Sequence, residues 1–123
     1  MAQLRVDSDS LELVLSGVEK LEGLHFDIRA PLSAVSGVEV LGDIQGAIPS
    51  LAEGGLKLIG TRAPGGPAVG TFLDHGRGAK VFVAVPNDHP GGLRISLRDQ
   101  SYDELLFSCE DLATLAGRLA RRP

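Results

Sequence analysis

The chain has 123 residues, of which 43% are hydrophobic and 23% are charged, and its formal net charge is −4. This size and composition are typical of a globular protein with one sizeable core, so we expect a single domain over residues 1–123. The acidic balance provides no long-range attraction for a phosphate backbone or an anionic bilayer, which argues against nucleic acid and bulk membrane surfaces as partners.

Cysteine usage and hydropathy favour a reducing, aqueous compartment. Cys109 is the only cysteine, so no intrachain disulfide is expected, and no C-x-x-C or Cys/His metal spacing occurs. The first residues lack a basic segment followed by an apolar one, and no apolar run approaches the roughly 20 residues needed to cross a bilayer. We therefore expect a cytoplasmic protein with no membrane span, no metal and no cofactor.

The first third of the chain predicts short strands and one helix. Leucine and valine alternate with polar residues on both sides of Asp7–Ser10, which predicts a hairpin with a short polar turn. Ser16 and Glu19 have the spacing of a capping box before an apolar stripe, so a short helix should follow the hairpin. Residues 26–41 alternate, pause at Pro31 and resume, which predicts two more short strands.

Residues 42–69 are rich in glycine and proline and carry no sustained period. A weak strand signal occurs only at residues 56–59, just before a glycine. This composition predicts the longest irregular segment of the chain.

From Gly70 onward, strand signals of five to seven residues alternate with turn-forming residues. The signals are GTFLD, KVFVAV, LRISLRD and DELLFSC, and this succession predicts an antiparallel meander. Apolar residues point to both faces of KVFVAV, so that strand should be central or covered on both faces. In the next strand the leucines and isoleucine should face inward, and Arg94, Ser96 and Arg98 should face water.

The last predicted element is an amphipathic helix. Ser108 and Asp111 are candidate caps, and acidic residues at the start with arginines at the end suit the helix dipole. One apolar stripe runs along it, formed by Leu112, Leu115, Ala116 and Leu119. The helix should therefore lie on a sheet.

The sequence predicts no catalytic or metal site. Gly76 and Gly78 form G-x-G, but a third glycine is missing and a strand follows, so we interpret this loop as a hairpin turn. His75 and His89 lie at opposite ends of KVFVAV, too far apart for one metal. Cys109 is in phase with the inward side of the last strand and should be a buried apolar residue. We therefore expect no enzymatic activity.

Several stretches resemble the small stand-alone bacterial proteins of the pleckstrin-homology-like (PH-like) type. They are LSGVEKLEGLHFDIRAPLSAVSGVEVL, GTFLDHGRGAKVFVAV and SYDELLFSCEDLATLAGRL, so the resemblance covers nearly the whole chain. It implies a mainly β fold with α: a partly open barrel of two near-orthogonal antiparallel sheets, a short helix after the first hairpin and a C-terminal capping helix. It also implies a role in binding rather than in catalysis.

Two features separate this chain from the PH domains that bind phosphoinositides. The loop between its first two strands, Asp7–Ser10, is acidic where those domains carry basic residues, and the chain has no tryptophan for the C-terminal helix. We therefore expect no phosphoinositide binding, and the resemblance is to the divergent bacterial members.

These observations favour a non-enzymatic module that binds another protein or a second copy of itself, because barrel-like folds leave strand edges that can accept another strand. An alternative is a small-molecule binder in which residues 42–69 form a lid, and an enzyme comes third. His25, His75 and Arg77 are the candidate contacts with a ligand or partner. If these three side chains cluster, the small-molecule and enzyme hypotheses gain support.

Overall fold

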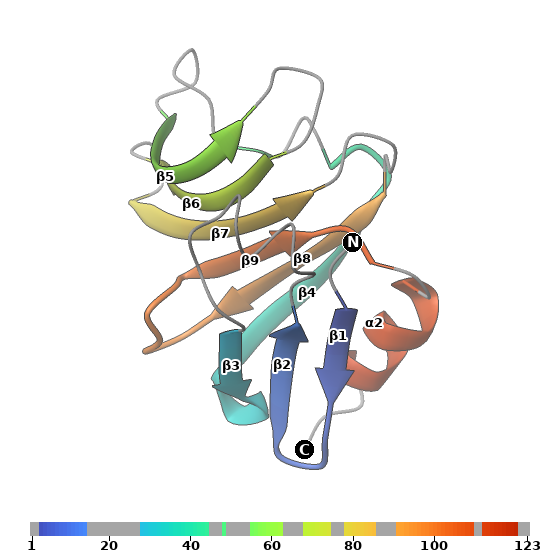
Figure 1. The fold of residues 1–123 in the computed structure, drawn as a ribbon. Helices are drawn as coiled ribbons and strands as arrows, with labels where there is room; N and C mark the ends of the chain where they lie inside the picture. The colour runs from blue at the N-terminus through green and yellow to red at the C-terminus, as the bar shows by residue number, and fades with distance from the viewer. Residues whose placement is uncertain are drawn as a thin grey trace.

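The computed structural model describes residues 3–14, 28–44, 48, 55–62, 68–74, 78–85, 91–109 and 112–120 (Figure 1). Within these ranges the chain forms nine strands, one short 3₁₀ helix and one α-helix, so the prediction of a mainly β fold with α is confirmed. The short helix predicted after the first hairpin lies outside the described residues.

Three antiparallel strands form the smaller sheet, in the order β1–β2–β3. They are β1 (Gln3–Val6), β2 (Ser10–Val14) and β3 (Ile28–Pro31). β1 and β2 form the predicted hairpin, and the Asp7 amide donates a hydrogen bond to the Ser10 carbonyl across the turn, at 2.8 Å. Leu11 and Leu13 are fully buried on the inner face of this sheet.

Six strands form the larger sheet, in the order β4–β8–β9–β7–β6–β5. They are β4 (Val35–Leu41), β5 (Gly55–Arg62), β6 (Ala68–Asp74), β7 (Ala79–Val85), β8 (Gly92–Leu97) and β9 (Glu104–Phe107). β7 and β9 run parallel, and the other pairs are antiparallel. The predicted meander and the prediction of two wholly antiparallel sheets are therefore wrong, although all four strands predicted after Gly70 are present.

β9 is more deeply buried than β8. All four residues of β9 are buried, whereas Arg94 and Ser96 of β8 are partly exposed. Both strands lie inside the larger sheet, β8 between β4 and β9, and β9 between β8 and β7. The chain order therefore differs from the spatial order.

The larger sheet packs side chains on both of its faces. Phe82 and Leu105 belong to the main core cluster, which also contains residues of the smaller sheet and of the C-terminal helix. Val81, Val83 and Leu106 belong to a second cluster. All five are completely buried, which confirms that KVFVAV is a central strand.

The stretch 42–69 is not irregular throughout. Residues 55–62 form β5, which pairs with β6 at the edge of the larger sheet that lies opposite β4. Ile44 and Ile48 are buried in the second cluster. The weak strand signal at residues 56–59 is therefore confirmed, and a strand of eight residues interrupts the irregular segment predicted over residues 42–69.

Helix α2 (Leu112–Ala120) contacts β1, β4 and β8, and therefore touches both sheets (Figure 1). Leu115 and Leu119 are buried in the main cluster, which confirms that this amphipathic helix packs on a sheet. The Ser108 hydroxyl donates to the Gly91 carbonyl at 2.8 Å, and its role as a cap of α2 stays a prediction. That bond ties the end of β9 to the start of β8. Asp111 lies outside the described residues.

Candidate functional site

The three predicted contact residues, His25, His75 and Arg77, all lie outside the described residues, so their grouping stays a prediction. Cys109 is buried, as predicted. Within the described ranges, no three His, Cys, Asp or Glu side chains are grouped so that they could hold a metal ion. None of the helices in those ranges has the length and apolar character that a membrane crossing requires.

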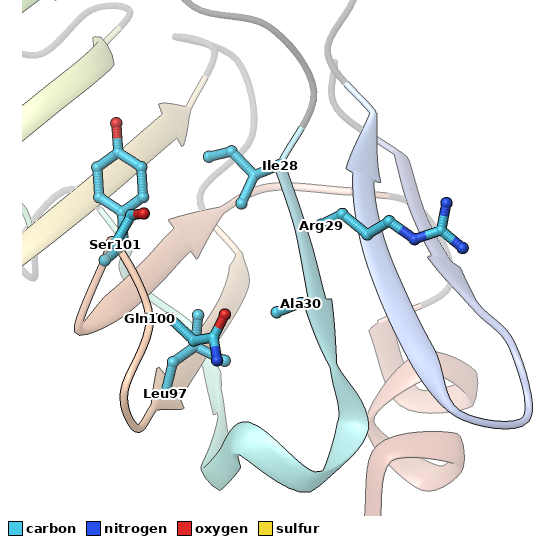
Figure 2. A pocket seen from close by; sticks show the side chains of 7 residues that line it. Ile28, Arg29, Ala30, Leu97, Gln100 and Ser101 are labelled. Carbon is cyan, nitrogen blue, oxygen red and sulfur yellow. The ribbon is translucent and has the colours of Figure 1, made fainter.

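A cavity of about 210 Å³ opens between the two sheets, where the edge of β3 faces the loop that joins β8 to β9 (Figure 2). We call this cavity the seam. The described residues that line it are Ile28, Arg29, Ala30, Leu97, Gln100, Ser101 and Tyr102. Within the described part of the chain, β3 pairs only with β2, so its other side borders the seam.

The floor of the seam is apolar and its rim is polar. Ile28, Ala30 and Leu97 are buried members of the main core cluster. Ser101 is exposed and Gln100 is partly exposed at the rim. Apolar surface with a few polar groups around it is the usual composition of a protein binding site.

Tyr102 forms the wall of the seam on the side of the larger sheet. Its hydroxyl lies 2.8 Å from the hydroxyl of Thr71. Its ring contacts Phe82 edge to face, with the centroids 5.5 Å apart, and the Lys80 ammonium lies 5.2 Å from the ring centroid. Because contacts of these kinds restrain both the ring and the hydroxyl, this wall is preformed.

The backbone of Arg29 presents hydrogen-bonding groups at the edge of β3. The Leu32 amide donates to the Asp9 carbonyl at 2.9 Å, and the alternation of an antiparallel ladder then directs the amide and carbonyl of Ala30 toward β2 as well. The amide and carbonyl of Arg29 therefore point out of the sheet, as does the carbonyl of Pro31. Proline has no amide, so pairing at that end of β3 is limited.

The opposite rim is a tethered turn that contains a backbone outlier. The Arg98 amide donates to the Ala34 carbonyl at 2.8 Å, and the Lys80 amide donates to Oδ2 of Asp103 at 2.8 Å. Between these two tethers, Asp99 has φ of 57°. This is the left-handed region, which is unfavourable for residues with a Cβ and most unfavourable for β-branched ones.

Asp99→Val is expected to lower the free energy of unfolding by about 1 to 2 kcal/mol, because valine is poorly accommodated at positive φ. Asp99→Gly should cause no loss, since glycine adopts this conformation freely. Urea denaturation of both variants measures the difference. Gln100→Val, one residue further along the same turn, is the matched control, and an equal loss there would contradict the strain at Asp99.

An ion pair with a buried carboxylate on the larger sheet was not predicted from the sequence. Arg94 was expected in water, but its side chain is only 26% exposed, and its Nε lies 3.1 Å from Oε1 of Glu104, which is 4% exposed. Nη1 of Arg94 donates to Oε1 of Glu39 at 3.0 Å. The prediction that Arg94 faces water is therefore confirmed only in part, because pairing of β8 with β4 and β9 places carboxylates on both sides of it.

The seam residues were also missed as a site, although Leu97 was correctly predicted to face inward. Residues 28–30 and 97–102 are far apart in the chain, and no local motif links them. Their only signal in the sequence was the proline that ends β3, which is typical of an edge strand.

Comparison with protein-family models, with curated proteins and with solved structures found no match. The seam is the candidate site, because it joins an edge strand, an apolar floor and a preformed wall in one place.

Proposed function

We propose that this protein is a non-enzymatic binding module of the PH-like type that binds an extended segment of another protein in the seam. The observation that carries the proposal is the edge of β3 beside an apolar cavity. Backbone groups of an edge strand hydrogen-bond to an added strand, and adjoining pockets receive its alternate side chains. The seam offers both.

The arrangement of the elements supports a PH-like barrel in part. Two packed sheets with a C-terminal helix against both of them agree with such a fold. The parallel pairing of β7 and β9 departs from it. The proposed binding mode depends on the seam and not on the family assignment.

The size of the seam favours a peptide over a whole small molecule. Pockets for drug-sized ligands usually measure about 300 to 1,000 Å³, whereas the seam measures about 210 Å³. The proposed lid is also poorly placed, because its residues 55–62 form β5, which lies at the edge of the larger sheet farthest from β4. A few side chains of a bound segment would suit the space better.

A library of random peptides displayed on phage and selected against the full chain tests the proposal. We expect the selected peptides to lose at least about tenfold in affinity for Ser101→Trp, because an indole at the rim would fill the seam; tenfold corresponds to about 1.4 kcal/mol. Thr114→Trp, at an exposed position of α2, is the matched control and should bind like the wild type.

Fluorescence anisotropy of labelled peptides gives the affinities, and thermal melts verify that both variants fold. Peptides that bind Ser101→Trp as tightly as the wild type would place the site outside the seam and contradict the proposal. A selection that enriches no peptide would also contradict it.

A further inference from the structure

We infer that the seam selects an extended segment in which one acidic residue stands between two apolar residues. This inference rests on the proposed function and names the chemistry of the partner. It follows from the charges on the outer face of the smaller sheet and from the apolar cavity on its inner side.

Charged side chains form an alternating row across the outer face of the smaller sheet. The register places Arg5 beside Glu12, and Glu12 beside Arg29. Nη1 of Arg5 lies 3.8 Å from Oε1 of Glu12. The row is therefore positive, negative and positive, and it ends at β3 with Arg29, whose side chain points away from the cavity in Figure 2. Opposite charges at directly facing positions stabilise neighbouring strands. The residue of a bound segment that faces Arg29 should therefore carry a carboxylate.

The alternation of side chains along a strand determines what surrounds that acidic residue. A residue that pairs with the backbone of Arg29 would point to the same outer face as Arg29 itself. The residues before and after it would then point inward, toward the floor formed by Ile28, Ala30 and Leu97. Those two positions favour apolar side chains, because the floor is apolar and the burial of apolar side chains against it is favourable.

Other charges near β3 restrict the acidic residue to one position. Nη2 of Arg29 lies 3.4 Å from the Ser10 hydroxyl, which itself lies 3.5 Å from Oδ2 of Asp7. Asp9 lines a shallow depression at the Pro31 end of β3. A carboxylate is therefore favoured beside Arg29 and opposed by like charge near Pro31. The seam should select a single acidic residue and not an acidic run.

Parallel peptide selections on the wild type, on Arg29→Glu and on Arg5→Glu test the inference. The wild type should enrich an acidic residue between two apolar residues, and Arg29→Glu should enrich lysine or arginine there with the apolar neighbours unchanged. Arg5→Glu is the matched control, because it reverses a charge in the same row on the strand far from the seam, and it should keep the acidic preference.

Affinities of one selected peptide, synthesised with glutamate or with lysine at the central position, give the size of the effect. We expect the glutamate form to bind the wild type about three- to tenfold more tightly than the lysine form does. This difference is the size expected when an exposed attraction between opposite charges is replaced by repulsion between like charges. Arg29→Glu should invert this order. Thermal melts verify that the variants fold.

The outcomes separate this inference from the proposed function. Two results would overturn the inference and leave the proposed function in place. In the first, the peptides lose affinity for Ser101→Trp but share no central acidic residue. In the second, the peptides selected on Arg29→Glu keep the central acidic residue. Peptides insensitive to Ser101→Trp would overturn both. The chain itself contains such a pattern, Val38–Glu39–Val40. Sedimentation velocity would detect self-association of the chain. Self-association that Ser101→Trp abolishes would identify a second copy as the occupant of the seam and overturn the inferred separate partner.

Discussion

Arg94→Met is expected to lower the free energy of unfolding by about 3 to 5 kcal/mol, because it removes the cation paired with the buried carboxylate of Glu104. The Glu104 side chain is 4% exposed, and the Arg94 guanidinium lies 3.1 Å from it. A carboxylate at such a depth is costly to bury when its counter-charge is missing. Urea denaturation followed by circular dichroism measures the loss, which is a large part of the total stability of a small domain.

Two further variants separate burial from simple loss of charge. Glu39→Gln removes the other carboxylate that lies near Arg94. Because the Glu39 side chain is 57% exposed, this change should lower the free energy of unfolding by no more than about 1 kcal/mol. The double variant Arg94→Met/Glu104→Leu should recover most of the loss, since replacing a whole buried ion pair by apolar residues is often neutral. A loss for Glu39→Gln equal to that for Arg94→Met would contradict the role assigned to burial.

Leu119→Ala is expected to cost about 2 to 5 kcal/mol, because the side chain is fully buried and its truncation leaves a cavity in the main core cluster. Thermal melts measure this loss. Thr114→Ala is the matched control on the exposed side of α2 and should change stability by no more than about 0.5 kcal/mol.

Deletion of residues 111–123 extends the same test from one side chain to the whole helix. Because α2 contacts strands of both sheets, its loss would expose apolar surface of the main cluster. We expect the shortened chain to aggregate or to lose cooperative unfolding. A cooperative melt near the full-length midpoint would show that α2 is not needed to cover the core.

Most of the elements and much of the burial follow from local patterns in the sequence. The first hairpin, the strands on both sides of Leu32–Ala34, the four strands after Gly70 and the amphipathic C-terminal helix all follow local patterns, and all are present. Such patterns report whether a residue faces water or a core, because a strand alternates its side chains and a helix places them on one stripe. The inward positions of Leu93 and Ile95 and the burial of Cys109 were predicted for this reason.

Which strands are neighbours is visible in the folded chain and not in its local patterns. β9 lies beside β7 in parallel, and β5 pairs with β6, because pairing depends on partner strands that are distant in the sequence. The pairing also explains the partial burial of Arg94. Its polar character predicted exposure, but the neighbouring strands supply two carboxylates that pair with it. The seam has the same origin: the edge of β3 meets Tyr102 only after both sheets have formed, so no local pattern could reveal it.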